Sequence, residues 1–194
     1  MHEQVAIDND FLMHLLEINR HEDVYGLICR FFAALGVDAW MHPLVYEKET
    51  DGHINRVGER LFQNNIIKRQ QFDAIWSADK SGRRYYEMMV QQIYLDFKGT
   101  PYPYANICSE WGARKSLGEV HTAVMCAFLG WNCFLSDDND AARNLGKIMQ
   151  ERMTHLIKVY NRESRCKYLK SMKIEDRMGL TSSELNVLSH SRCN

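Results

Sequence analysis

The sequence predicts an α/β fold: a three-layer α/β/α arrangement with a mainly parallel central sheet and extra helices. Two short apolar runs, residues 5–7 and 131–135, have the length of buried strands, and each is followed by acidic residues. Between and beyond these runs, apolar residues recur at the three- and four-residue spacing of helices. The 194 residues are 45% hydrophobic and 25% charged, which is typical of a globular domain and excludes disorder as the main state.

Two helices are predicted after the first strand. Apolar residues at helical spacing within residues 11–16 indicate the first. Asn19 and Glu22 form a capping-box-like start for the second, an apolar stripe over residues 24–35 continues it, and Gly36 ends it.

The middle of the chain predicts one weak strand and two helices. Residues 37–46 favour an extended conformation, but Pro43 allows only an edge or irregular strand. Residues 47–58 are polar and predict a loop around a turn. Apolar spacing then predicts two helices, over residues 59–79 and 82–97.

The last part of the chain predicts a helix, a strand and further helices. A helix begins at Leu117 and ends at Gly130, directly before the second apolar strand. Apolar residues within 145–160 predict one long helix, and Thr181 with Glu184 predicts a capped helix near the end. We expect one domain over residues 1–165, with residues 50–100 as a helical insertion, and a helical, polar tail over residues 166–194.

Composition restricts the classes of function. The 24 basic and 25 acidic residues exclude a strongly basic nucleic-acid coat but permit a local basic patch. No apolar run approaches the roughly 20 residues that span a bilayer, and no secretory signal is visible, so we expect a cytoplasmic protein without membrane contact. The six cysteines form no C-x-x-C pair, which disfavours a zinc site and a disulfide framework.

Acidic residues follow both predicted strands and open the helix that leads into the second. They are Asp8 and Asp10, then Asp137, Asp138 and Asp140, and lastly Glu119. If the two strands are parallel neighbours, all three groups lie at one edge of the sheet. Crowded carboxylates repel one another, and a divalent cation such as Mg²⁺ or Mn²⁺ removes that repulsion. The pattern predicts metal-assisted phosphodiester hydrolysis; the alternative is that each acid is only a helix cap or a first-turn residue.

Three segments that carry these acids together resemble PIN-domain nucleases. Residues 5–12 resemble the opening strand of the family with its terminal Asp, residues 118–124 resemble a Gly-Glu helix start, and residues 134–140 resemble the strand that ends in Thr-x-Asp-x-Asp. The resemblance covers roughly residues 4–47 and 105–150.

By position, the resemblance implies particular roles for the acids. Asp8, Glu119 and Asp138 match the catalytic, metal-holding acids, and Asp140 matches an accessory ligand. Glu47 is the best match to a further metal-ligating acid, with Glu49 as its rival. Ser136 replaces the usual Thr and is expected to contact an acid or a substrate phosphate, while Asp137 has no assigned role.

The resemblance implies a metal-dependent endonuclease that uses Mg²⁺ or Mn²⁺ to activate water, most often on RNA. Many relatives are toxins of toxin–antitoxin pairs. Two alternatives stay open: a catalytically inert PIN-like module that binds RNA or protein, and a nuclease that acts on DNA or flaps. Metal binding separates the first alternative from the enzyme, and a panel of substrates separates the second.

Substrate binding needs positive charge near the acids. The nearest candidates are Arg114, Lys115 and Arg143; more distant ones are Lys147, Lys68, Arg69, Arg83 and Arg84, and Tyr102 and Tyr104 are candidates for base stacking. Methionine and aromatic residues within 66–94 predict a surface for an antitoxin or a second copy of the chain. His121 follows Glu119 by two residues, about 200° round a helix, and is expected to point away from the acids.

Overall fold

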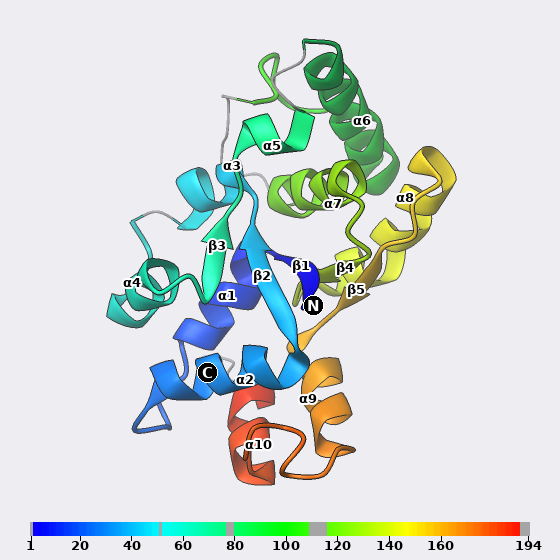
Figure 1. Ribbon diagram of the computed structural model, residues 1–194. Helices are drawn as coiled ribbons and strands as arrows, with labels where there is room; N and C mark the ends of the chain where they lie inside the picture. The colour runs from blue at the N-terminus through cyan, green and yellow to red at the C-terminus, as the bar shows by residue number, and fades with distance from the viewer. Residues whose placement is uncertain (1, 51, 77–79, 109–115, 191–194) are drawn as a thin grey trace.

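The computed structural model describes residues 2–50, 52–76, 80–108 and 116–190. In these residues a five-stranded parallel sheet, in the order β3-β2-β1-β4-β5, is covered by helices on both faces, so the predicted three-layer α/β/α fold is confirmed (Figure 1). No helix within the described ranges has both the length and the apolar character needed to cross a bilayer.

The strands are short and pair in consecutive register. They are β1 (Glu3–Ile7), β2 (Val37–Met41), β3 (Ile67–Arg69), β4 (Cys133–Leu135) and β5 (Lys158–Tyr160). β1 lies at the centre, between β2 and β4. Val5 pairs with Ala39 on one side and with Cys133 on the other.

Alternation of side chains along the strands divides the core into two layers. Val5 and Ile7 point to one face and Ala6 to the other, as the two-residue repeat of a strand requires. The helices of the first face are α1 (Asn9–Leu16), α2 (Val24–Leu35), α4 (Arg56–Gln63), α9 (Arg162–Lys170) and α10 (Ser182–His190). Those of the second face are α5 (Phe72–Trp76), α6 (Lys80–Lys98), α7 (Leu117–Leu129) and α8 (Gly146–Met153).

Short helical turns connect some of these elements. They are α3 (Pro43–Val45) and the π-helical turns η1 (Tyr46–Thr50) and η2 (Ala141–Leu145). Both π-helical turns follow carboxyl ends of strands, η1 after β2 and η2 after β4. This places them at the edge of the sheet where the acids were expected.

Two predicted helices are wrong because each spans a short strand. Residues 59–79 form the end of α4, strand β3 and α5, with 77–79 outside the described residues, rather than one helix. Residues 145–160 form the last residue of η2, then α8 and then β5, rather than one long helix. Strands of three residues are too short to show a two-residue pattern, and pairing with a neighbouring strand stabilises them.

Two local predictions around α2 and β2 are also wrong. Asp23, rather than Asn19, caps α2, and its carboxylate accepts a hydrogen bond from Gly26 N–H across 2.8 Å. β2 is an interior strand, paired with both β1 and β3. Pro43 lies beyond the strand, at the start of α3, where the missing N–H has no consequence.

The helices of the predicted tail pack on the main core. The capping box at the start of α10 is confirmed: Thr181 Oγ1 accepts from Glu184 N–H across 3.1 Å, and Thr181 N–H donates to the Glu184 carboxylate across 2.8 Å. Leu169 and Leu188 are buried in the same cluster as β1. The predicted boundary at residue 165 falls inside α9.

Candidate active site

The candidate active site lies where two parallel strands, β1 and β4, end side by side. Ile7 pairs with Leu135, and Asp8 N–H donates a hydrogen bond to the Leu135 carbonyl across 3.2 Å. From β1 the chain first adds β2 and β3 on one side of the sheet, and later adds β4 and β5 on the other side. Ligands of open α/β sheets bind where the direction of strand addition reverses in this way. The expectation that the two acidic turns meet at one edge is confirmed.

Asp8 caps helix α1 and is the most buried acid at this edge, with 2% of its surface exposed. Its Oδ1 accepts a hydrogen bond from Phe11 N–H across 2.8 Å. Its Oδ2 is enclosed and has no hydrogen-bond partner of normal geometry among the described residues. Burial and then the charge of Glu119 raise the pKa of Asp8 well above its usual value, although the nearby Ser136 hydroxyl lowers it in part.

Glu119 stands in the first turn of α7 and is 8% exposed. Burial is the main cause that raises the pKa of Glu119 to about 7, and the charges of Asp138 and Asp10 add to it. The charge of Glu119 therefore raises the pKa of Asp8, and the charge of Asp138 raises the pKa of Glu119. The three acids that the sequence placed in the site share one electrostatic neighbourhood.

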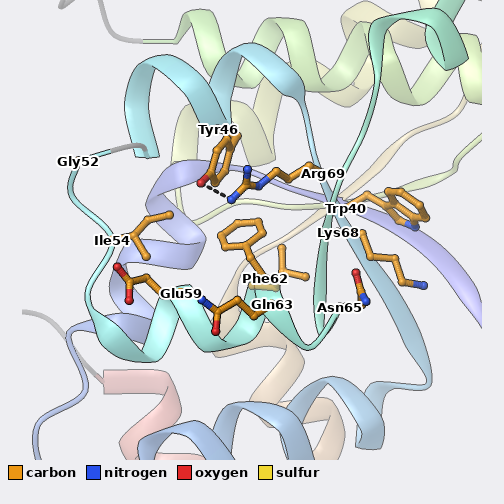
Figure 2. A pocket seen from close by; sticks show the side chains of 11 residues that line it. Trp40, Tyr46, Gly52, Ile54, Glu59, Phe62, Gln63, Asn65, Lys68 and Arg69 are labelled. Carbon is orange, nitrogen blue, oxygen red and sulfur yellow. Dashed lines mark hydrogen bonds between the residues drawn. The ribbon is translucent and has the colours of Figure 1, made fainter.

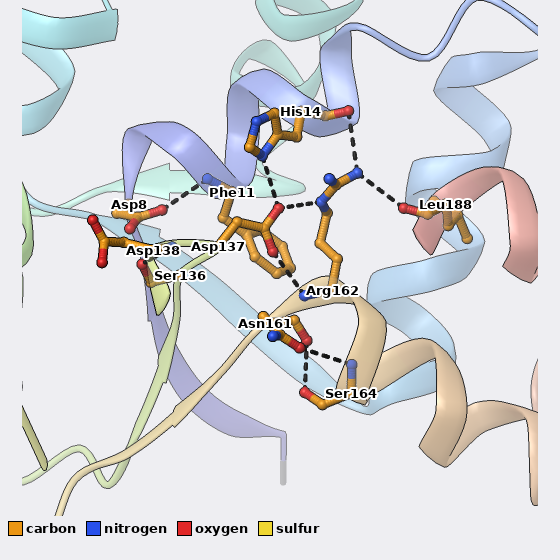
Figure 3. Close-up of polar contacts among 10 residues, drawn as sticks. All are labelled: Asp8, Phe11, His14, Ser136, Asp137, Asp138, Asn161, Arg162, Ser164 and Leu188. Carbon is orange, nitrogen blue, oxygen red and sulfur yellow. Dashed lines mark hydrogen bonds and ion pairs between the residues drawn. The ribbon is translucent and has the colours of Figure 1, made fainter. Parts of the chain in front are cut away.

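A tight turn after β4 holds Asp138 in place. Asp138 N–H donates to Ser136 Oγ across 3.1 Å, and Asp138 Oδ1 accepts from the N–H groups of Asp140 (2.6 Å) and Ala141 (2.9 Å). Figure 3 shows the buried Ser136 close to both Asp8 and Asp138; it accepts from Asp138 N–H, and its hydroxyl lowers the pKa of Asp8 in part. Asp140 is exposed at the start of η2, and a ligand role for it stays a prediction.

Asp137 points away from these acids and has structural partners (Figure 3). It accepts hydrogen bonds from the Arg162 guanidinium, from Arg162 N–H (2.9 Å) and from His14 Nδ1 (2.9 Å). Burial would raise the pKa of Asp137, but the hydrogen bonds from His14 and Arg162 outweigh it and lower the pKa. Arg162 also donates to the Leu188 carbonyl across 2.9 Å, so Asp137 anchors α9 and α10 to the edge.

Glu47 and Glu49, the two candidates for a further metal-ligating acid, both lie on the turn η1 but in different surroundings. Glu47 is exposed, whereas the Glu49 carboxylate lies against Gly118. A Cβ atom at Gly118 would come within 2.7 Å of Glu49 Oε2, so this glycine makes room for the carboxylate beside Glu119. The structure thus brings Glu49 to the edge, and a ligand role for Glu47 stays a prediction.

Only some of the cations predicted near the acids lie within the described residues. Arg143 is exposed on η2, and Arg114 and Lys115 lie outside the described residues. Lys98, at the end of α6, lowers the pKa of Glu119 and was not identified from the sequence. The folding of α6 onto α7 brings it to the edge, and no local motif indicates that contact.

The acids gather without forming a closed ligand set. Among the described residues, no three His, Cys, Asp or Glu side chains are arranged to hold a metal ion. The donor chemistry nevertheless fits a hard divalent cation, because the donors are carboxylate oxygens and Asp8 Oδ2 is buried with no hydrogen-bond partner in the part of the chain that the structure describes. Burial and neighbouring carboxylates raise the pKa values of Asp8 and Glu119, which is the effect that a bound cation would offset.

Comparisons of the chain with protein-family models, curated proteins and solved structures give no significant match. The similarity to PIN-domain nucleases therefore stays a hypothesis that rests on the motifs at Asp8, Glu119 and Asp138. What the structure adds is their convergence at the carboxyl ends of β1 and β4.

Proposed function

We propose that this protein is a divalent-metal-dependent nuclease that hydrolyses phosphodiester bonds, with RNA as its substrate class. One observation carries the proposal: Asp8, with its orphaned Oδ2, converges with Glu119 and Asp138 at the edge of the sheet where α/β proteins bind ligands. Buried carboxylates that repel one another are destabilising in themselves, and a cation that binds between them offsets this.

The residues of the chain have distinct parts in this proposal. Asp8, Glu119 and Asp138 would hold Mg²⁺ or Mn²⁺, with Glu49 beside them. When bound, such an ion would stabilise negative charge on the phosphate and favour loss of a proton from a water molecule, whose hydroxide form attacks phosphorus. The N–H of Phe11 fixes Asp8 Oδ1 and leaves Oδ2 for the ion, and Ser136 holds the turn that carries Asp138.

The test is cleavage of single-stranded RNA with Mn²⁺ and with chelator, by the wild type and by Asp8→Asn. An asparagine caps a helix as well as an aspartate does, so the variant is expected to fold. We expect cleavage to need the ion and to fall by about a hundredfold or more in the variant. The matched control is Asp73→Asn, which changes an exposed first-turn acid of α5. Cleavage that persists in chelator and in Asp8→Asn overturns the proposal.

An inert binding module is the second candidate, and two observations favour it. The acids do not form a closed ligand set within the described residues, and Asp8 and Asp138 each accept hydrogen bonds from the start of a helical segment. Calorimetric titration with Mn²⁺ separates the candidates, because the enzyme binds the ion and loses affinity in Asp138→Asn. Cleavage of single-stranded DNA or branched DNA in preference to RNA points instead to the DNA or flap nuclease.

A toxin role would require a partner protein, and helix α6 offers a surface for one. Tyr85, Met88 and Leu95 are exposed on this helix, which overlaps the predicted partner segment. An antitoxin or a second copy of the chain would cover them. Size-exclusion chromatography of the purified protein checks this surface: a homodimer or a tightly bound small protein supports it, and a monomer at micromolar concentration contradicts it.

A further inference from the structure

A groove runs along the edge strand β3, between η1 and α4, on the side of the sheet remote from β4 (Figure 2). We call it the β3-edge groove; it has a volume of about 820 Å³. Its lining combines aromatic rings with cations, and includes Trp40, Tyr46, Phe62, Lys68 and Arg69. Its size is within the usual range of ligand sites.

The cations of the β3-edge groove lie on its aromatic rings. The Arg69 guanidinium carbon lies 3.5 Å from the centroid of the Tyr46 ring and 5.2 Å from that of Phe62, and the guanidinium donates a hydrogen bond to the Tyr46 hydroxyl. Lys68 Nζ lies 5.2 Å from the centroid of Trp40. The Arg69 guanidinium thus lies over one face of Tyr46 and Lys68 lies over Trp40, so each cation and its ring form one layered surface.

The two cations of the groove differ in their ionic partners among the described residues. Lys68 forms an ion pair with Asp38 across 3.1 Å, whereas within the described ranges Arg69 forms none. Glu59 also lines the groove, but it extends from α4 beside Ile54, away from the Arg69 head (Figure 2). The end of the groove at Arg69 therefore favours an anionic group.

The turn η1 joins this groove to the candidate active site. Tyr46, its first residue, lines the groove, while Glu49 of the same turn lies against Gly118 at the acidic edge. Thr50 Oγ1 donates to Asn9 Oδ1 across 3.0 Å, next to Asp8 in the chain. A polymer that crosses η1 passes from the groove to the acids.

We propose that the β3-edge groove binds a segment of single-stranded nucleic acid that leads to the candidate active site, an inference that rests on the proposed nuclease function. Arg69 contacts a phosphate of the segment, and bases pack against the layered surfaces that Arg69 forms with Tyr46 and Lys68 forms with Trp40. Flat rings next to cations suit unpaired bases with their phosphates, whereas a duplex keeps its bases stacked internally.

The test measures binding without cleavage. Fluorescence anisotropy follows a labelled oligouridylate with the full chain in chelator, for the wild type, Arg69→Gln and Arg60→Gln. Arg60 is the matched control: it is also exposed, and its guanidinium carbon lies 4.0 Å from the centroid of the Tyr25 ring, outside the groove. We expect Arg69→Gln to weaken binding about tenfold and to reduce the slope of log affinity against log salt by about 0.7, the value for one lost phosphate contact on a single strand. Arg60→Gln is expected to bind like the wild type.

Three outcomes overturn the proposed binding by the groove. They are no binding by the wild type, equal affinities for the wild type and Arg69→Gln, and equal losses of affinity in the two arginine variants. Competition by duplex RNA as effective as by single strands overturns the single-strand assignment. Both variants are checked for an unchanged thermal midpoint, so that a loss of binding is not a loss of fold. A photoreactive 5-iodouridine in the oligonucleotide is expected to crosslink to Tyr46 or Trp40, and crosslinking at Tyr25 instead contradicts the proposal.

Failure of the groove and failure of the proposed function give different results. If the chain binds the oligonucleotide through Arg69 but does not cleave it with Mn²⁺, the nuclease proposal fails and the groove stands. If it cleaves with Mn²⁺ while Arg69→Gln binds normally, the groove fails and the nuclease stands. If both hold, Arg69→Gln raises KM with little change in kcat, whereas Asp8→Asn lowers kcat and still binds.

Discussion

Two buried polar clusters meet on helix α7, and they differ in whether their polar atoms have partners. Glu119 belongs to the acidic edge, where Asp8 Oδ2 is orphaned and burial raises the pKa of both acids. His121, two residues further along the helix, belongs to a continuous series of hydrogen bonds. We call it the His–Tyr chain; its side chains are His42, Tyr86, His121 and Tyr102.

The first half of the His–Tyr chain sets the direction of its hydrogen bonds. Leu44 N–H donates to His42 Nδ1 across 3.1 Å, so the neutral ring carries its proton on Nε2 and donates it to the Tyr86 hydroxyl across 2.8 Å. The Tyr86 hydroxyl in turn donates to His121 Nδ1 across 2.8 Å. The network itself assigns both tautomers.

The second half ends on the backbone. His121 Nε2 donates to the Tyr102 hydroxyl across 2.9 Å, and Tyr102 donates to the Ile107 carbonyl across 3.5 Å. Burial lowers the pKa of His42 well below its usual value and that of His121 to about 3, so both rings are neutral. His121 thus points away from the acids as predicted, into a network that fixes the packing of α6 on α7.

The comparison teaches that burial alone does not mark a functional polar group. Polar atoms with partners specify how elements pack, and polar atoms without them are available to a ligand. Asp137 and Asp138 differ in a related way. Both carboxylate oxygens of Asp137 accept hydrogen bonds from Arg162 or His14, whereas the hydrogen bonds described for Asp138 reach its Oδ1, and its charge raises the pKa of Glu119.

The largest expected effect comes from removal of the partner of Asp137. Arg162 is 4% exposed, and Arg162→Ala leaves the Asp137 carboxylate largely buried without its cation. We expect the free energy of unfolding to fall by about 3–5 kcal/mol, measured by urea denaturation. Lys167→Ala is the control, because it removes an exposed helical ion pair with Glu163 and is expected to change little. Equal stabilities of the two variants would contradict the anchoring role.

The acidic edge makes a contribution to stability that falls as pH rises. The pKa of Glu119 in the folded protein is about 7, above the ordinary 4.5, so the folded state keeps a proton that the unfolded chain releases. The contribution of Glu119 to stability therefore decreases between about pH 4.5 and 7 and is level above that, by up to about 3 kcal/mol for this group. Because His121 contributes the opposite slope below about pH 6.5, the contribution of Glu119 is measured as the difference between the wild type and Glu119→Gln in urea denaturation with chelator, and this difference is expected to change across the range.

The His–Tyr chain predicts the opposite slope. The pKa of His121 in the folded protein is about 3, below the ordinary 6.5, so its contribution is fully present above about pH 6.5 and is lost as the pH falls toward 3. The acid-side loss is therefore expected to persist in Glu119→Gln. A variant whose entire pH profile is flat would show that the two clusters are not independent.

Removal of one hydroxyl tests whether the His–Tyr chain is structural. Tyr86→Phe keeps the ring but removes the hydroxyl that accepts from His42 Nε2–H and donates to His121 Nδ1. The expected loss is about 1–3 kcal/mol in the free energy of unfolding, from thermal or urea denaturation. Tyr85→Phe, at the neighbouring and 47% exposed position of α6, is the control and should be near neutral.

The smallest expected effect has the opposite sign. In chelator, Asp8→Asn is expected to stabilise the fold by about 1 kcal/mol, because it removes a buried charge beside Glu119 and keeps the helix cap. Asp137→Asn, the same change at the satisfied acid, is expected to destabilise it. Thermal midpoints with and without Mn²⁺ check this: the ion should stabilise the wild type more than Asp8→Asn. Destabilisation by both substitutions would remove the distinction between the two acids.

Local sequence signals were sufficient to predict much of the fold and the convergence of the acids that follow β1 and β4 in the candidate site. The apolar runs that became β1 and β4 are continuous, and the acids after them are adjacent in the chain, so parallel pairing alone brings them together. The capping box of α10 and the stop of α2 at Gly36, whose φ is +66°, also depend on neighbouring residues. Such signals involve a few consecutive residues, so they can be interpreted without the rest of the fold.

The tertiary structure decided what depends on distant partners. β3 and β5 exist through pairing with β2 and β4, and nothing within their three residues distinguishes them from helix. Contacts between residues far apart in the chain also decide which acids lie at the edge. Gly118 leaves room for the Glu49 carboxylate, and Arg162 binds Asp137 away from the other acids. The residue types and their order thus determined the chemistry available at the edge. Packing of elements far apart in sequence determined which carboxylates have partners and which are left for a ligand.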